Sequence, residues 1–350
     1  MTAATTHRKP DRTVRKALLG LLACMLSLLL AAAAFLLYVQ HHLSSQVDRI
    51  DGVFEGLHDR PARSTGRAAD ALNILLLGTD RRSDVPTTGS GAQSPSWIPG
   101  EQRSDAIMLL HIDADRRGAS VISIPRDSWV DVPGHGSNKI NAAFSLAGPS
   151  LAIQTVEQLT GVHIDHLAVI DWNGFRELTD SVGGVWVDVP RTVHDSARDI
   201  TWTAGSHLLD GDQALAYVGQ RYGLPGGDLD RVKRQQAYLR SLMEASLHTQ
   251  MRSDPRMVYD FLDVVTRNLS VDSEWSSSSM TRLAFSLRSM RSASIGYLTA
   301  PVKGLGMEGA QSVVHLDRAA GAGLWAAVRA DTLDEWEAEH ADDLTGRRVS

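Results

Sequence analysis

The chain has 350 residues, of which 43% are hydrophobic and 22% are charged, and its formal net charge is −6 at pH 7. Residues 1–16 carry a net charge of +4, which leaves −10 for the remainder of the chain. This composition is ordinary for a globular protein, and a body this acidic is expected to repel nucleic acid.

Residues 17–39 form a continuous apolar run without a charged side chain. At about 1.5 Å per residue, a helix of this length crosses a hydrocarbon core of roughly 30 Å. Because the basic cluster precedes the run, the positive-inside rule predicts a cytoplasmic N-terminus and an extracytoplasmic body. A cleaved signal peptide is the alternative, although its apolar core is usually shorter. The only cysteine, Cys24, lies in this run, so the exported part offers no disulfide, thiol nucleophile or thiolate metal ligand.

The next residues are expected to connect the membrane run to a folded domain. Apolar residues at near-helical spacing predict a juxtamembrane helix over 40–57, and a polar stretch with Pro61 and Gly66 predicts a linker over 58–70. We therefore divide the chain into a basic cytoplasmic tail (1–16), a transmembrane helix (17–39), a juxtamembrane helix and linker (40–71), a folded catalytic domain (72–332) and a charged tail (333–350).

The folded domain begins with short apolar runs that have charged residues at their ends. Residues 72–77, 106–112 and 121–124 have the pattern of buried strands. The short connection between the second and third runs predicts an antiparallel pair. The charged residues at these strand ends are Asp80, Arg103, Asp105, Arg126 and Asp127.

Helical and strand patterns alternate through the rest of the domain. We expect helices near 140–159, 173–181, 212–217, 254–267, 276–289 and 317–330, and strands near 167–170, 185–189 and 295–299. Residues 191–211 are expected to be irregular, and the tail after 333 is expected to fray. The alternation predicts an α/β fold, a three-layer α-β-α domain with a central mixed sheet, preceded by one N-terminal transmembrane helix.

Residues 217–239 gather basic and amide side chains around a Leu-Pro-Gly-Gly turn. If the part after Gly227 is helical, Arg231, Arg234 and Gln235 share one face. Guanidinium groups match phosphate or carboxylate oxygens bidentately, so this face is expected to bind an anion. A surface helix whose basic residues are merely solvated is the alternative.

Asp80 and Asp105 together are suited to one hard divalent cation such as Mg2+, which favours one or two carboxylates together with phosphate oxygens. Each Arg/Asp pair taken alone is better explained by a turn with a local ion pair, or by a cap. Three such combinations and an arginine-bearing helix together favour a shared site. The sequence has no G-x-x-x-x-G-K-[ST] loop, no G-x-S-x-G elbow and no H-E-x-x-H spacing, which argues against three common classes of hydrolase.

Six ordered motifs resemble the LytR-CpsA-Psr family: LLLGTDRR (75–82), RSDAIMLLHID (103–113), ISIPRDSWV (122–130), KINAAFSLAGPSL (139–151), GGVWVDVP (183–190) and the stretch at 217–239. The resemblance implies a membrane-anchored, extracytoplasmic phosphotransferase that moves a glycopolymer from a polyprenyl-diphosphate carrier to peptidoglycan, forming a phosphodiester bond. It also implies paired aspartates that hold Mg2+, arginines that hold the diphosphate, and a hydrophobic groove for the lipid.

Carried over by motif, the resemblance implies a role for particular residues of this chain. The metal ligands would be Asp80 and Asp105, and the diphosphate would be bound by Arg103, Arg126, Arg221, Arg231, Arg234 and Gln235. The catalytic residues would be Asp105, Arg126 and Arg234. Gly219 stands where the family often has an arginine, and losing that charge-assisted contact would weaken diphosphate binding by about 1.5–3 kcal/mol.

Two other functions use the same residues. A pyrophosphatase would hydrolyse the lipid diphosphate, and a catalytically weak protein would bind the lipid diphosphate or the polymer without turnover. A transcription regulator is disfavoured by the apolar run and by the acidic body. The expected partners are the lipid-linked glycopolymer, peptidoglycan and the membrane, with no nucleic acid. The expected location is the cell membrane, with a single pass and an extracytoplasmic catalytic domain.

Overall fold

The computed structural model describes residues 41–42, 45–80, 86–95, 97–246, 254–346 and 349. The chain divides into two units, Met1–Ser45 and Gln46–Ser350. The cytoplasmic tail and the transmembrane helix expected at 1–16 and 17–39 lie outside the described residues. Within the described residues, no helix combines the length and the apolar character that a membrane crossing needs.

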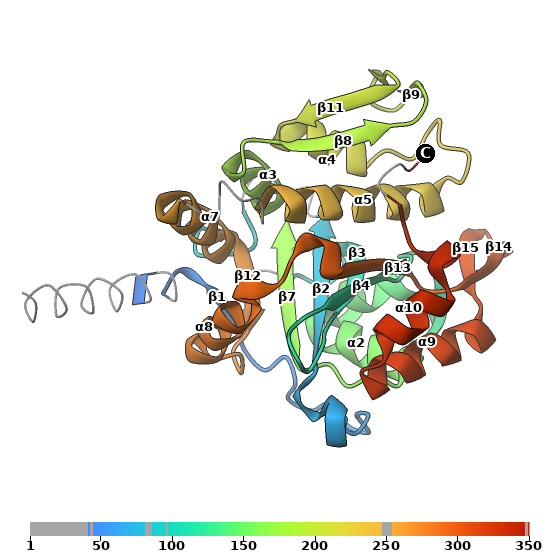
Figure 1. Cartoon of the computed structure of the whole chain (residues 1–350). Coiled ribbons are helices and arrows are strands. Elements are labelled where there is room, and N and C mark those ends of the chain that lie inside the picture. Colours follow the sequence, from blue (N-terminus) through green and yellow to red (C-terminus); the bar gives the residue numbers. More distant parts are fainter. Residues whose placement is uncertain are drawn as a thin grey trace, which may run out of the picture. The chain divides into compact units, whose positions relative to one another are not determined.

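A mixed sheet of seven strands forms the centre of the second unit (Figure 1). In spatial order its strands are β1 (Asp48–Ile50), β12 (Leu269–Asp272), β7 (His166–Asp171), β2 (Leu72–Asp80), β3 (Arg103–Ile112), β4 (Ala119–Ser123) and β13 (Ile295–Thr299). β2 runs parallel to β7 and antiparallel to β3, and β3 is antiparallel to β4. The predicted α/β fold with a central mixed sheet is confirmed, as is the antiparallel pairing of the second and third apolar runs.

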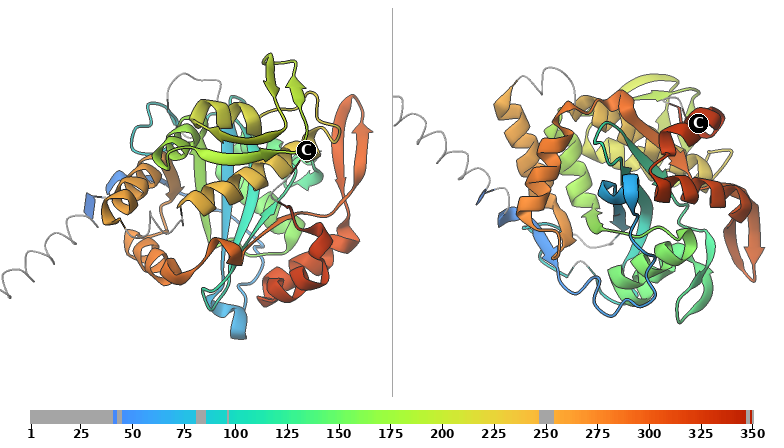
Figure 2. Two further views of the ribbon diagram at one scale, coloured as in Figure 1. Left: turned by 45° about the horizontal axis from the view of Figure 1, so that its top comes forward. Right: turned by 60° about the horizontal axis from the view of Figure 1, so that its bottom comes forward.

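Helices cover both faces of this sheet, and Figure 2 shows the arrangement from two further directions. Leu75 and Leu77 of β2 belong to a hydrophobic cluster with α2 (Ile140–Thr160) and α9 (Arg318–Ala330). The alternate residues Ile74 and Leu76 belong to a second cluster, with α5 (Asp228–Ser246) and α8 (Ser277–Ser286). A strand buried on both faces has mostly apolar residues on each face, which is why 74–77 form a continuous apolar run.

A third cluster lies beside α5 and involves smaller elements. It contains residues of α3 (Trp172–Ser181), α4 (Gly211–Val218) and the antiparallel pair β8 (Val185–Val189) and β11 (Gly205–Leu209). The helices expected near 140–159, 173–181, 212–217, 276–289 and 317–330 are thus present, as is α7 (Pro255–Asn268). The interruption in α2 is also present, because Gly148 has a φ of 72°.

Several short strands were not predicted. Residues 191–211, expected to be irregular, contain β9 (Val193–Asp195), β10 (Ile200–Trp202) and β11. Two further hairpins were missed, β5 (Trp129–Val132) with β6 (Gly136–Lys139), and β14 (Val302–Glu308) with β15 (Gln311–Leu316). These strands are short and partly exposed, so their pairing depends on the hairpin partner rather than on a local apolar run.

Two expectations at the ends of the domain are wrong. The helix expected over 40–57 is replaced at Asp48–Ile50 by β1, which pairs with β12, so the folded unit starts before residue 72. The tail expected to fray after 333 contains α10 (Leu333–Glu339). Leu333 is 1% exposed and Trp336 packs on the α2 side of the sheet. In both segments the apolar side chains are few, but they pack against the core of the domain, where Leu333 is buried and Ile50 and Trp336 are partly buried.

Candidate functional site

The predicted strand-end charges meet at one edge of the sheet. Because β2, β3 and β4 alternate in direction, the end of β2, the start of β3 and the end of β4 lie together. Asp80 pairs with Arg103 in the ladder, whereas Gly78 pairs with Ala106 and Thr79 with Ser104. The unpaired Asp105 is therefore the extra residue of a β-bulge, a device that redirects side chains beside functional sites.

Arg126 lies at the centre of a network of charges. Its guanidinium group donates a hydrogen bond to Asp105, and its Nε lies 3.7 Å from Oδ2 of Asp127 and 3.5 Å from Oδ1 of Asp228. Asp228, the first residue of α5, also has Oδ1 2.9 Å from Nη2 of Arg231. The side chains of Arg126 and Arg231 are 8% and 2% exposed, so water screens these charges only weakly.

A side-chain hydrogen bond joins Asp80 to Asp105 and extends the network. Burial alone would raise the pKa of Asp105, but the charges of Arg126 and Arg231 outweigh it and hold the pKa below its ordinary value. Two carboxylates this close favour a shared proton or a shared cation. Since the network keeps Asp105 ionised, its oxygens and those of Asp80 fit a hard divalent cation such as Mg2+.

Several buried polar atoms beside the network have no hydrogen-bond partner among the described residues. They include Nε of Arg126, Nε of Arg231, Oδ2 of Asp228 and the hydroxyl groups of Thr79 and Ser104. A buried polar group without a partner costs about 1–3 kcal/mol. An anion with several oxygens, bound beside the two arginines, would satisfy both guanidinium donors.

Arg234 has different surroundings. Its Nη1 donates a hydrogen bond of 2.7 Å to Oε1 of Gln220, and its guanidinium carbon lies 4.4 Å from the centre of the Tyr217 ring. Burial lowers the pKa of Arg234 despite the opposing influence of Tyr217. The arginines Arg231 and Arg234 share a helix face as expected, but Arg231 pairs with Asp228 and Arg234 with Gln220.

The remaining predicted residues lie nearer the surface. Arg103 and Arg221 are exposed, and Gln235 is partly buried. Arg221 is close enough to Arg231 for its charge to act on it, although burial is the main reason that the pKa of Arg231 falls to about 10.

Gly219 forms the C-cap of α4, and another arginine lies beside it. A Cβ atom on Gly219 would lie 2.9 Å from Nη2 of Arg198 and 2.9 Å from the carbonyl oxygen of Leu215. Arg198 also donates a hydrogen bond of 3.4 Å to the Gly219 carbonyl oxygen. The space left by the missing side chain is thus next to a guanidinium group from elsewhere in the chain.

Two members of the network were missed by the sequence analysis. Asp228 has an ordinary explanation in the sequence, as an acidic residue in the first turn of a helix. Lys139 lies in a motif that carried the family resemblance, but nothing marked its charge, and its Nζ lies 2.9 Å from Oδ1 of Asp127. A search for acidic residues at helix starts after glycine turns would have found Asp228.

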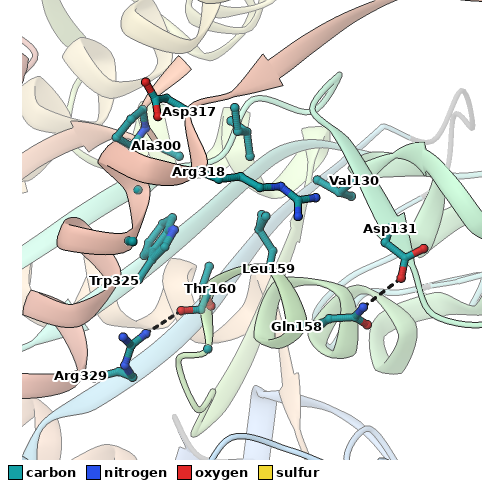
Figure 3. Close-up of a pocket in the computed structure, with 15 residues that line it drawn as sticks. Val130, Asp131, Gln158, Leu159, Thr160, Ala300, Asp317, Arg318, Trp325 and Arg329 are labelled. Carbon is teal, nitrogen blue, oxygen red and sulfur yellow. Dashed lines mark hydrogen bonds between the residues drawn. The ribbon is translucent and has the colours of Figure 1, made fainter. Parts of the chain in front are cut away.

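A cavity of about 320 Å³ lies between the end of α2, β5 and α9 (Figure 3). Gln158 donates a hydrogen bond of 2.9 Å to Asp131 there, and Arg329 donates one of 2.8 Å to the carbonyl oxygen of Thr160. Of the described residues that line this cavity, none was predicted as a site residue. It shares no lining residue with the charge network at the sheet edge.

Residues 38–328 match the model of the LytR_cpsA_psr family. The chain belongs to the LytR_cpsA_psr family. It is 32% identical over 307 residues to the cell wall biosynthesis protein LcpA of Corynebacterium glutamicum, and the match covers 77% of this chain and 59% of that protein. It is 31% identical over 221 residues to the polyisoprenyl-teichoic acid–peptidoglycan teichoic acid transferase TagU of Enterococcus faecalis, covering 63% of this chain and 67% of TagU.

The match spans less than two thirds of LcpA. Among solved structures, the LytR-Csp2A-Psr enzyme from Actinomyces oris superimposes with a TM-score of 0.62, at 23% identity, over 81% of this chain and 96% of that one. This likeness shows that the second unit has the fold of LytR_cpsA_psr proteins.

Proposed function

We propose that this protein is a membrane-anchored phosphotransferase that moves a glycopolymer from a polyprenyl-diphosphate carrier onto peptidoglycan. The observation that carries the proposal is a pair of buried arginines, Arg126 and Arg231, beside the hydrogen-bonded carboxylates of Asp80 and Asp105. The Nε atoms of both arginines lack hydrogen-bond partners among the described residues. A diphosphate presents the oxygens that such donors bind. The printed names of relatives, such as the teichoic acid transferase TagU, support the same reaction class.

In the proposed reaction, an acceptor hydroxyl oxygen bonds to the phosphorus that bears the polymer. The bond from that phosphorus to the bridging oxygen breaks, the lipid leaves as its monophosphate, and the hydroxyl proton passes to the departing phosphate or to solvent. Negative charge builds up on the transferred phosphoryl group and on the departing phosphate. Arg126 and Arg231 would stabilise this charge, because Asp228 holds both guanidinium groups in place before the substrate binds.

Asp80 and Asp105 would hold a Mg2+ ion, which when bound would neutralise negative charge on the diphosphate. Arg126 already contacts three carboxylates, so an anion must compete with them for its guanidinium group. Asp127 is offset by Lys139, and a cation on the aspartate pair would offset Asp105. Cation and diphosphate binding are therefore expected to strengthen one another.

Asp105 would orient the acceptor hydroxyl rather than remove its proton. The neighbouring arginines hold the pKa of Asp105 below its ordinary value, which makes it a weak base. The exposed Arg103 and Arg221 would contact the diphosphate from the rim of the site. Arg234 would act as a positioning residue through Gln220 and Tyr217, and Gln235 would support the diphosphate from the same helix.

The location that we propose follows from the apolar run at 17–39 and the basic residues before it. A single pass would place the catalytic unit outside the cytoplasm, beside a donor that stays in the membrane. No role in nucleic-acid binding is proposed, because the body of the chain is strongly acidic.

The test uses the full-length protein in detergent with a polyprenyl-diphosphate-linked glycopolymer, peptidoglycan and Mg2+. We expect polymer to become attached to peptidoglycan, and Arg231→Ala to reduce this transfer by about 100-fold or more. Arg329→Ala is the matched control, since Arg329 lies in the separate cavity and its loss is expected to leave transfer unchanged.

The alternatives give different products in the same assay. Release of free phosphate without attached polymer would identify a pyrophosphatase, and donor binding without any product would identify a catalytically weak binding protein. Full transfer by Arg231→Ala would contradict the proposed site.

A further inference from the structure

A second cluster of ligand-type side chains lies at the far end of β3. His111 is six residues beyond Asp105 in that strand, a separation of about 20 Å at the usual strand rise. His111, Asp113 and Asp331 each place one ligand atom within 4.8 Å of the others. Nε2 of His111 lies 3.2 Å from Oδ1 of Asp331 and 4.0 Å from Oδ1 of Asp113.

The neighbours of His111 determine which of its ring nitrogens carries hydrogen. Asn73, opposite His111 in the ladder, donates from Nδ2 to the carbonyl oxygen of His163 at 3.1 Å. The Asn73 atom that faces Nδ1 of His111, at 2.8 Å, is therefore the acceptor Oδ1. Nδ1 must then be the donor, so in the neutral ring Nε2 carries the lone pair.

Nε2 of His111 and Oδ1 of Asp331 lie 3.2 Å apart, a contact that becomes a hydrogen bond with a proton on Nε2 and shared coordination with a metal ion between the two atoms. Among the described residues, the polar groups that face Nε2 are the carboxylates of Asp331 and Asp113, which are themselves acceptors. The ring is 0% exposed, so Nε2 meets these carboxylates rather than bulk water. A buried imidazole nitrogen that faces two carboxylates is satisfied by a positive charge between them, either a proton on Nε2 or a metal ion.

The carboxylates are held in place by the backbone. The amide nitrogen of Ala114 donates to both oxygens of Asp331, at 3.2 and 3.4 Å. Asp331 has a φ of 57° at the C-cap of α9, which orients its side chain toward β3. A Cβ atom on Gly118 would lie 2.3 Å from Oδ2 of Asp113, so the glycine leaves the space that this carboxylate occupies.

We propose that His111, Asp113 and Asp331 bind a divalent transition-metal ion of the Zn2+ class, at a site separate from the diphosphate network. An imidazole nitrogen and carboxylate oxygens are ligands that Zn2+ accepts, and a histidine that binds metal through one nitrogen usually donates from the other, as His111 does to Asn73. A cavity of about 270 Å³, lined by Arg67, Asp115 and Asp334 together with two of the ligands, gives the ion an entry path and space for water ligands.

The ion would have a structural effect. His111 and Asp113 belong to the end of β3 and the turn after it, whereas Asp331 ends α9. The ion therefore joins the sheet to the helix layer at the edge remote from the diphosphate network. It also offsets an excess of acidic groups around Asp113. Burial, together with the charges of Asp331, Asp115, Asp334 and Glu337, raises the pKa of Asp113 to about 6.

The experiment titrates Zn2+ into the metal-free full-length protein in detergent and compares variants. Asp331→Asn is the main variant, because asparagine also adopts positive φ and keeps an oxygen for the Ala114 amide. We expect Asp331→Asn and the partly exposed Asp113→Asn each to weaken one Zn2+ site by about 10-fold or more. His166→Gln is the control, because His166 has one carboxylate neighbour, Asp272 at 3.2 Å, and does not belong to the cluster.

Thermal unfolding provides a second readout. Zn2+ is expected to raise the unfolding temperature of the wild type and of His166→Gln, and to have a smaller effect on Asp331→Asn and Asp113→Asn. X-ray absorption of the Zn2+ complex should show one imidazole nitrogen together with carboxylate oxygens. Equal Zn2+ affinity and equal thermal shifts in the wild type and both aspartate variants would overturn the proposal, as would a wild type that binds no Zn2+.

Discussion

Replacing Arg126 with Ala removes the centre of the charge network, and the structure limits the cost of doing so. Asp127 keeps Lys139 at 2.9 Å, and Asp228 keeps its 2.9 Å pair within α5. Only Asp105 loses a hydrogen-bonded cation. We therefore expect the free energy of unfolding to fall by about 1.5–3 kcal/mol, the value of one charge-assisted hydrogen bond.

The effect on polymer transfer is expected to be larger than the effect on stability. Loss of one preorganised donor to a developing anion typically lowers a rate by about 100- to 1,000-fold. The assay measures kcat/KM for transfer from the lipid-linked donor to peptidoglycan, with urea unfolding in parallel. Arg60→Ala is the control, since it breaks a partly buried pair with Glu157 elsewhere in the fold and should destabilise the protein without lowering transfer in proportion. Transfer by Arg126→Ala at the rate of the wild type would refute the reasoning.

Three further predictions follow from other contacts. Arg234→Met should lower the free energy of unfolding by about 1–3 kcal/mol in urea titrations, because it leaves the buried Gln220 without its 2.7 Å partner, and unchanged stability would contradict the contact. Gly219→Arg should lower the unfolding temperature by crowding Arg198, and adding Arg198→Ala should restore part of the loss; full stability of the single variant would show that the space is free. Burial, with the charge of Asp334 added, raises the pKa of Glu337 even though Ser120 donates to it, so the folded state binds this proton more tightly than the unfolded state. The stability that Glu337 contributes is therefore present below the ordinary pKa of glutamate and is lost as the pH rises through the raised pKa. In Glu337→Gln the free energy of unfolding should fall less steeply with pH over this range, and a slope equal to that of the wild type would contradict the prediction.

The edge of the sheet that carries the network was predictable because its strands are buried on both faces. Continuous apolar runs marked β2, β3 and β4, and alternating directions then bring Asp80, Asp105 and Arg126 to the same edge. The bulge at Asp105 has no local signature, since it arises only when the ladder between β2 and β3 forms. The resemblance to a family supplied the roles, which spacing alone did not.

Other features depend on contacts between distant segments. Helical spacing placed Arg231 and Arg234 on one face, but their long side chains reach different partners, Asp228 and Gln220. His111 gave no signal in the sequence, because its ligand-type neighbour Asp331 is 220 residues away. Similarly, β1 and α10 are too short for periodicity to distinguish, and they are defined by the surfaces that they cover.

The most direct measurement is a crystal structure of the full-length protein with Mg2+ and a non-hydrolysable polyprenyl-diphosphate analogue. We predict diphosphate oxygens within hydrogen-bonding distance of Arg126 and Arg231, with the metal ion on Asp80 and Asp105. A diphosphate bound in the separate cavity beside Arg318, with Arg126 still engaged only by its carboxylates, would contradict the account.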